Sequence, residues 1–119
     1  MSRDYITCHI LDTVKGIPAA HVKATLSKLD KQGNSTLLAS GTTDVDGRIS
    51  VWASESITSV DPGTHKIRFE TGPYLEQITG AEAFFPYVEI VFHVSNPPQA
   101  HYHIPLLLSP YAYHTYRGS

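Results

Sequence analysis

Apolar and polar residues alternate along most of this chain with a period of two, the pattern of half-buried β-strands. The alternation predicts eight strands, at 5–12, around 22–26, at 36–43, 48–52, around 67–69, and at 88–94, 101–109 and 111–117. Glycine and proline separate these segments at short intervals, as in all-β sandwiches. The segment from Pro73 to Gly80 is predicted as a short helix, because proline is tolerated in a first helical turn. The pattern therefore predicts an all-β sandwich with one short helix.

The same alternation predicts which side of each strand faces the core. The side chains expected inward are Ile6, Cys8, Ile10, Val22, Ala24, Leu26, Ile49, Val51, Ile67, Phe69, Val88, Ile90, Phe92, Val94, Tyr102, Ile104, Leu106 and Leu108. Those expected on the opposite side include Thr7, His9, Arg48, Ser50, Trp52, His101 and His103. Pro105 lies inside a predicted strand, where it cannot donate to the ladder, so we expect a bulge there or a position whose N–H would point away from the neighbouring strand.

Composition narrows the class of protein. At 119 residues the chain supports one domain, 1–119, and a net charge of −2 argues against a nucleic-acid-binding module. No apolar run reaches membrane-spanning length, and the first residues lack the apolar region of a signal peptide. The only cysteine, Cys8, excludes an intrachain disulfide and fits a reducing compartment. We expect a cytoplasmic protein; a peroxisomal one is the alternative, although no Ser-Lys-Leu address is present.

Three outward residues suggest chemistry. If their strands share a sheet, His9, Arg48 and His103 emerge together on its outer face. Two imidazoles can serve as general base and general acid near neutral pH, and a guanidinium can hold carbonyl oxygens and stabilise an oxyanion. Periodicity alone does not show that these strands are neighbours.

Several segments of the chain resemble one known family. They are Thr7-Cys8-His9-Ile10-Leu11-Asp12-Thr13, Asp46-Gly47-Arg48, Phe84-Phe85-Pro86, the stretch from His101 to Pro110, and the ending Tyr116-Arg117-Gly118-Ser119. Together they are similar to the 5-hydroxyisourate hydrolases, the transthyretin-related enzymes of urate breakdown, over essentially the whole chain. The ending is the most specific of these segments.

The resemblance implies a transthyretin-like sandwich of two four-stranded sheets with one short helix, assembled as a homotetramer, a dimer of dimers. It implies that the first, fourth, seventh and eighth strands form one sheet, whose outer face lines a channel that holds the active site. It also implies a cofactor-free and metal-independent hydrolase that converts 5-hydroxyisourate to 2-oxo-4-hydroxy-4-carboxy-5-ureidoimidazoline. Matching positions make His9, Arg48, His103 and Ser119 the candidate catalytic residues, and Tyr116, Arg117 and Gly118 the candidate substrate-binding residues.

The roles of these residues follow as a hypothesis. One of His9 and His103 takes a proton from water, the other carries it toward the leaving nitrogen, and Arg48 holds the carbonyl oxygens. Ser119 orients the water or the substrate through its hydroxyl or a chain-terminal carboxylate. His101 shares the face of His103 and is either its supporting partner or a bystander. The remaining histidines are expected to be surface residues or locally hydrogen-bonded: His21, His65, His93 and His114.

Two other functions compete with hydrolysis. The first is a carrier, because transthyretin shares the fold and binds an aromatic hormone in the same channel. The resemblance argues against a carrier, which lacks the histidine–arginine group, extends beyond the position of Ser119 and carries a secretory signal. The second is a metal site made by His101, His103 and His9. That pattern is weak, because no cysteine or carboxylate cluster accompanies it.

Overall fold

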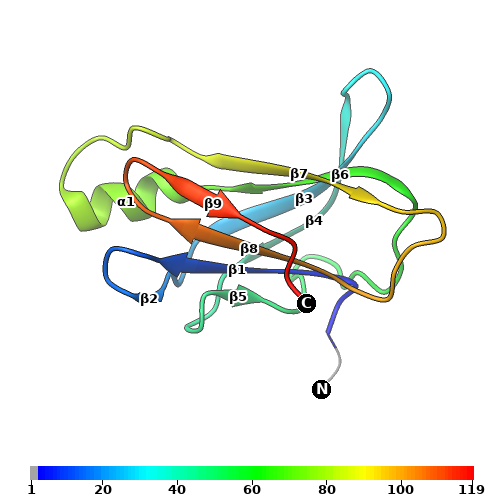
Figure 1. Ribbon diagram of the computed structural model, residues 1–119, viewed down its shortest axis with the longest axis horizontal. Helices are drawn as coiled ribbons and strands as arrows, with labels where there is room; N and C mark the ends of the chain where they lie inside the picture. The colour runs from blue at the N-terminus through cyan, green and yellow to red at the C-terminus, as the bar shows by residue number, and fades with distance from the viewer. Residues whose placement is uncertain (1–2) are drawn as a thin grey trace.

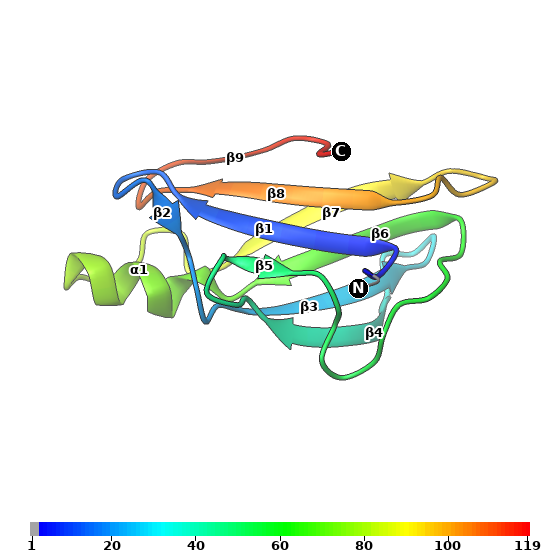
Figure 2. The same ribbon diagram turned by 90° about the horizontal axis from the view of Figure 1, so that it is seen from below.

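A computed structural model describes residues 3–119 as two β-sheets packed face to face (Figures 1 and 2). One sheet has the order β4-β3-β6-β7, with bounds Ser35–Thr42, Lys23–Leu29, Gly63–Phe69 and Val88–Val94. The second has the order β2-β1-β8-β9, with bounds Ile17–Pro18, Ile6–Asp12, Tyr102–Leu108 and Tyr113–Thr115. A further strand of the second sheet, β5 at Arg48–Ile49, pairs with β1, and helix α1 spans Thr71–Thr79. The predicted all-β sandwich is confirmed.

The second sheet contains the four predicted strands that the resemblance groups together, namely the first, fourth, seventh and eighth. It has five strands rather than the expected four, because the two residues of β2 pair with the end of β1. Strand β1 lies parallel to β8 in an unbroken register from Ile6 opposite Tyr102 to Asp12 opposite Leu108. Strand β9 runs back along the far edge of β8, so the end of the chain returns over this sheet (Figure 2).

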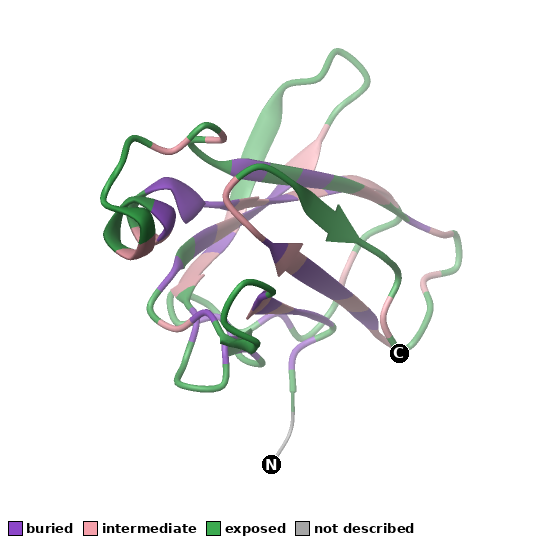
Figure 3. Cartoon of the chain, turned by 60° about the vertical axis from the view of Figure 1, so that its left-hand side comes forward, coloured by how far each residue is buried: buried purple, intermediate pink, exposed green. Residues whose placement is uncertain are grey.

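The inner faces of β1 and β8 form much of the core. Ile6, Cys8, Ile10 and Leu106 are completely buried, and Ile104 is only 5% exposed. Each such aliphatic side chain stabilises the fold by roughly 1.5–3 kcal/mol relative to an exposed position. Figure 3 shows the burial on β1 and β8 and the contrasting exposure of β9. The predicted inward side of these two long strands is confirmed.

The prediction for the segment 48–52 is wrong after its second residue. Strand β5 ends at Ile49, and the chain bends at Ser50 and Val51, which reverses the alternation. Trp52 is therefore 1% exposed and Val51 46% exposed. The buried Asp4 carboxylate accepts the Trp52 backbone N–H at 2.9 Å, and the indole N–H donates to the Ile6 carbonyl at 2.8 Å. Two hydrogen bonds thus hold this ring inside.

The predicted strand 111–117 is shorter than expected at both ends. It begins only at Tyr113, since residues 109–112 form a turn in which the Ser109 N–H donates to the Ala112 carbonyl at 3.0 Å. Its other end is limited by Pro105. Proline occupies a regular position in β8 without a bulge, but it has no N–H to donate. The His103 carbonyl accepts a hydrogen bond from the Gly118 N–H. Backbone N–H and C=O groups of residues two apart on a strand point to the same side, so the backbone nitrogen of Pro105 also faces this tail. Pairing with β9 stops at Thr115 and resumes only at Gly118.

Smaller differences concern other boundaries. The helix begins two residues before Pro73 and ends before Gly80, which adopts a left-handed conformation with φ of 72°. Phe92 was expected to point fully inward but is partly exposed at the rim of the core. Within residues 3–119 the one helix is far too short to cross a bilayer.

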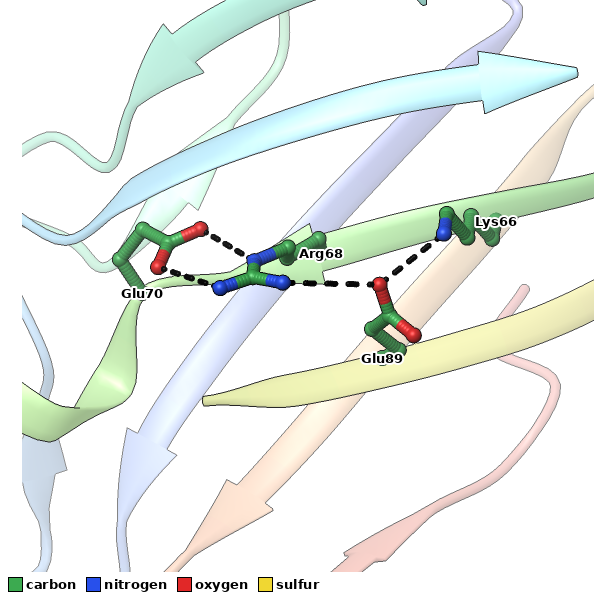
Figure 4. A network of polar contacts seen from close by, with 4 residues as sticks. All are labelled: Lys66, Arg68, Glu70 and Glu89. Atoms are coloured by element: carbon green, nitrogen blue, oxygen red, sulfur yellow. Dashed lines mark hydrogen bonds and ion pairs between the residues drawn. The ribbon is translucent and has the colours of Figure 1, made fainter. Parts of the chain in front are cut away.

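Charged side chains on the outer face of the β4-β3-β6-β7 sheet form ion pairs with one another. Lys66 donates to Glu89 at 3.0 Å, and Arg68 donates to Glu70 at 2.7 Å and lies 3.9 Å from Glu89 (Figure 4). The Arg68 guanidinium also stacks 3.6 Å above the Tyr87 ring. Because these groups are partly exposed, such ion pairs contribute little stability. This face therefore leaves no free cation along β6.

The placement of Trp52 can be tested against its exposed neighbour. Trp52→Ala should lower the free energy of unfolding by about 3–5 kcal/mol, since it leaves a large cavity and an unpaired Ile6 carbonyl. Val51→Ala should change it by no more than about 0.5 kcal/mol. Urea unfolding followed by far-ultraviolet circular dichroism measures both values. A larger loss of unfolding free energy for Val51→Ala than for Trp52→Ala would contradict this placement and support the simple alternation.

Candidate active site

Strand pairing brings the three predicted outward residues together around β1. His9 lies opposite Arg48 on the antiparallel β5, and Thr7 lies opposite His103 on the parallel β8. The rings of His9 and His103 are stacked, with centroids 6.5 Å apart and planes inclined by 24°. The structure therefore gathers residues from three distant segments on the outer face of one sheet.

A tight turn fixes the position of Arg48. The Asp44 carboxylate accepts the backbone N–H groups of Asp46 and Arg48 at 2.9 and 3.0 Å. Gly47 has φ of +73°, and a Cβ on it would lie 2.5 Å from the Ile10 carbonyl oxygen, so only glycine fits beside β1 here. Within residues 3–119 the Arg48 guanidinium has no ion pair, unlike Lys66 and Arg68 on the other sheet. It is free to bind a ligand.

The tail reaches the same place through Gly118. Its N–H donates to the His103 carbonyl at 2.9 Å, and a Cβ on it would lie only 2.5 Å from Cδ2 of the His103 ring. The absence of a side chain thus lets the tail lie against the imidazole. Ser119 follows and borders a cavity of about 290 Å³ whose walls are Arg3, Thr7, Cys8, Arg48, Ser50, His101, His103 and Ser119.

The structure places Tyr116 and Arg117 on the other side of the tail. Both border a second cavity of about 340 Å³ between β7 and β8, which His103 also lines. The Arg117 guanidinium donates to the Gln99 side-chain oxygen at 2.7 Å and lies 5.2 Å from the Tyr102 ring centroid. Only His103 joins these residues to the Arg48 cavity. Their substrate-binding roles stay predictions.

The surroundings keep the histidines uncharged. Burial lowers the pKa of His103, and the positive charge of Arg48 lowers it further, with His101, His9 and Arg3 adding to the effect. Burial and then Arg48 also lower the pKa of His9, against a backbone hydrogen bond at Asp46 and nearby carboxylates. For His101 the causes of a lowered pKa are burial and Arg3. At neutral pH these imidazoles are poised to accept protons.

Sequence reasoning missed three residues of this cavity: Arg3, Thr7 and Ser50. Thr7 had a signal, because it shares the outward parity of His9. It is only 4% exposed, and its hydroxyl lies 2.7 Å from His103 Nδ1 and 2.9 Å from His101 Nε2. Cys8 is buried as predicted, and this burial raises the pKa of its thiol to about 12, which makes it a poor nucleophile.

The metal-site alternative finds little support in the side chains. Residues 3–119 contain no group of three or more histidine, cysteine, aspartate or glutamate side chains arranged to hold a metal ion. Thr7 lies between His101 and His103 and occupies one nitrogen of each ring. Among the other histidines, His65 is a core residue rather than a surface one, and its Nδ1 is hydrogen-bonded locally to the Gly63 carbonyl at 3.1 Å.

The two-sheet architecture defines a protein of the transthyretin fold. The crystal structure of sea bream transthyretin in complex with thyroxine matches it with a TM-score of 0.82 and 32% identity, over 96% of this chain and 94% of that one. The structure of Klebsiella pneumoniae 5-hydroxyisourate hydrolase matches with a TM-score of 0.75 and 32% identity, over 96% and 98%. The backbone alone therefore does not separate a carrier from an enzyme.

The sequence comparisons give the family. Residues 6–118 match the HIUase/Transthyretin family, and the chain belongs to it. It is 42% identical to a probable 5-hydroxyisourate hydrolase of Schizosaccharomyces pombe, over 96% of this chain and 90% of that protein. It is 41% identical to the 5-hydroxyisourate hydrolase of Mus musculus, over 96% of this chain and 94% of that one.

The electrostatic coupling in the site gives a titration prediction. In proton NMR, His9 and His103 should titrate with midpoints below the ordinary pKa of 6.5, because burial and Arg48 disfavour the imidazolium. Arg48→Gln removes the charge, so both midpoints should rise toward 6.5. Arg68→Gln, on the other sheet, should leave them unchanged. Wild-type midpoints above 6.5, or no response to Arg48→Gln, would contradict this electrostatic account.

Proposed function

We propose that this chain hydrolyses 5-hydroxyisourate to 2-oxo-4-hydroxy-4-carboxy-5-ureidoimidazoline, a step in urate degradation, without a metal ion. One observation carries the proposal. Two imidazoles with lowered pKa and an unpaired guanidinium share the outer face of one sheet, with the His9 and His103 rings 6.5 Å apart. The full-length relatives named as 5-hydroxyisourate hydrolases support the same reaction.

The proposed chemistry is addition of water to the carbonyl carbon of the cyclic amide. A neutral imidazole removes a proton from water as the oxygen attacks, because its depressed pKa keeps it uncharged at neutral pH. The attack turns the carbonyl oxygen into an oxyanion, which the Arg48 guanidinium stabilises. A proton is then delivered to the ring nitrogen as the carbon–nitrogen bond breaks. His9 and His103 divide these two transfers between them.

Ser119, Gly118 and the preceding residues complete the proposed site. Ser119 borders the cavity shared with Arg48 and His103, where its hydroxyl can orient water or substrate. Gly118 holds this part of the tail against the His103 ring. We assign Tyr116 and Arg117 to substrate binding from the side of the second cavity, which His103 also borders.

We also propose a homotetramer, a dimer of dimers. Strand β7 forms one edge of its sheet and β9 one edge of the other, and unpaired strand edges are templates for pairing with another chain. Apolar side chains are exposed beside these edges, among them Val91, Phe84 and Tyr111 at 59%, 67% and 77%. Sedimentation velocity should give four chain masses at micromolar concentration; a monomer would contradict the assembly.

The carrier is the second candidate, because sea bream transthyretin with bound thyroxine has this backbone. A carrier needs a channel that binds an aromatic ligand but no proton donors or acceptors poised for chemistry. Here the sheet presents two histidines and an unpaired arginine instead. A carrier would bind the substrate stoichiometrically without shortening its lifetime, so the assay of hydrolysis separates the two functions.

Hydrolysis is tested by producing 5-hydroxyisourate in place from urate with urate oxidase and following the decay of its ultraviolet absorbance. The chain should accelerate the decay catalytically and equally well after exhaustive chelation. His103→Ala and Arg48→Ala should each lower turnover by on the order of 10²–10⁴-fold, through loss of proton transfer and of oxyanion stabilisation.

His21→Asn is the matched control, since His21 is exposed and lies outside both the Arg48 cavity and the cavity that Tyr116 and Arg117 border. It should retain wild-type turnover, and circular dichroism should show that all three variants fold. Decay at the spontaneous rate with the wild-type chain would end the proposed function. Unchanged turnover in folded His103→Ala and Arg48→Ala would end the assignment of the site.

A further inference from the structure

Thr7 is the only described side chain whose one polar atom contacts two histidines of the site. Its hydroxyl lies 2.7 Å from His103 Nδ1 and 2.9 Å from His101 Nε2, and the residue is 4% exposed. The position follows from the register, because Thr7 pairs with His103 across the parallel strands β1 and β8. The rings of His101 and His103 are stacked with centroids 6.2 Å apart. The three side chains form a continuous line, His103–Thr7–His101.

The single hydroxyl hydrogen of Thr7 links the tautomer of His101 to that of His103. A hydroxyl has one hydrogen, so Thr7 donates to one ring nitrogen and accepts from the other. If Thr7 donates to His103 Nδ1, then His101 Nε2 carries a hydrogen and donates to Thr7. If Thr7 donates to His101 Nε2, then His103 Nδ1 carries the hydrogen, and its Nε2 is a free base. The tautomers of the two rings therefore change together.

We propose that Thr7 is a relay between these histidines, with His101 as the outer proton acceptor of the hydrolysis. The proposal rests on the proposed function and makes His103 the general base. In the resting state His103 Nδ1 donates to Thr7, Thr7 donates to His101 Nε2, and His101 Nδ1 carries the hydrogen of that neutral ring. When water attacks, His103 Nε2 takes its proton, the Nδ1 proton moves to the Thr7 oxygen, and the Thr7 proton moves to His101 Nε2. His103 ends neutral and His101 ends as imidazolium, so the protons balance.

The charges around the line favour this direction of transfer. An imidazolium at His103 would be opposed by Arg48, His101, His9 and Arg3, whereas Arg3 is the charge that opposes one at His101. The hydroxyl therefore moves the positive charge away from Arg48, whose guanidinium remains available to the oxyanion. Asp44 and Asp46 act on His9 and lie outside the line.

Thr7→Val tests the relay, since it keeps the shape of the side chain and removes the hydroxyl. It should lower kcat by on the order of 10²-fold and leave KM within about twofold, because Thr7 is only 4% exposed and its hydroxyl is hydrogen-bonded to the two histidines. Thr7→Ser should restore kcat to within a few-fold of the wild type. His101→Asn removes the acceptor and should lower kcat as much, and the double variant Thr7→Val/His101→Asn should be no slower than either single variant.

Mixtures of H₂O and D₂O give a readout that a structural role would not move. The wild type and Thr7→Ser should show a curved dependence of kcat on deuterium fraction, because several protons move in one step, and Thr7→Val a linear one. Wild-type kcat in Thr7→Val, equal losses in Thr7→Val and Thr7→Ser, or additive losses in the double variant would overturn the relay.

The relay and the proposed function can fail separately. Spontaneous-rate decay with the wild-type chain refutes the function itself. Nitrogen-15 chemical shifts of the imidazoles, which need no substrate, report the coupling directly. Thr7→Val should shift the tautomer balance of both His101 and His103, and Thr7→Ser should shift neither. A change at one ring alone would show that the two imidazoles are not coupled through the hydroxyl.

Discussion

The parallel pairing of β1 with β8 is the constraint on which the site depends. In a parallel pair, residues opposite each other point to the same face, so one register decides both what is buried and what is presented outward. Here it sets Thr7 beside His103 and Ile6 beside Tyr102. On its other edge β1 pairs with β5, which sets Arg48 opposite His9. The first strand thus joins His103 on β8 to Arg48 on β5.

The core enforces this register. A slip of one residue would turn His103 into the interior in place of Ile104 or Leu106, whose side chains are 5% and 0% exposed. Burying an imidazole without partners and exposing several aliphatic side chains would cost several kcal/mol. The hydrophobic pattern therefore positions the catalytic candidates indirectly. The opposite sheet uses its outer face differently, because Lys66, Arg68, Glu70 and Glu89 neutralise one another there (Figure 4).

The sequence was most informative where alternation continues over a whole strand. Along β1 and β8 it predicted the inward and outward residues, and with them His9 and His103. The alternation failed at Trp52, because β5 has only two residues. After the bend, the buried Asp4 carboxylate accepts a hydrogen bond from the Trp52 backbone N–H. Thr7 was visible as an outward residue, but its contacts depend on the pairing of β1 with β8, residues about 95 apart in sequence. Local patterns do not encode such pairings.

The central claim is that the outer face of this sheet binds the reacting ring against Arg48 and His103, which line the cavity, with His9 adjacent to both. A crystal structure with urate, which keeps the carbonyl-bearing bicyclic ring but lacks the 5-hydroxyl group, tests it most directly. Urate should occupy the cavity beside Ser119, with a carbonyl oxygen within hydrogen-bond distance of the Arg48 guanidinium. Urate bound instead in the cavity of about 800 Å³ between β2 and α1, with the Arg48 face empty, would contradict the account.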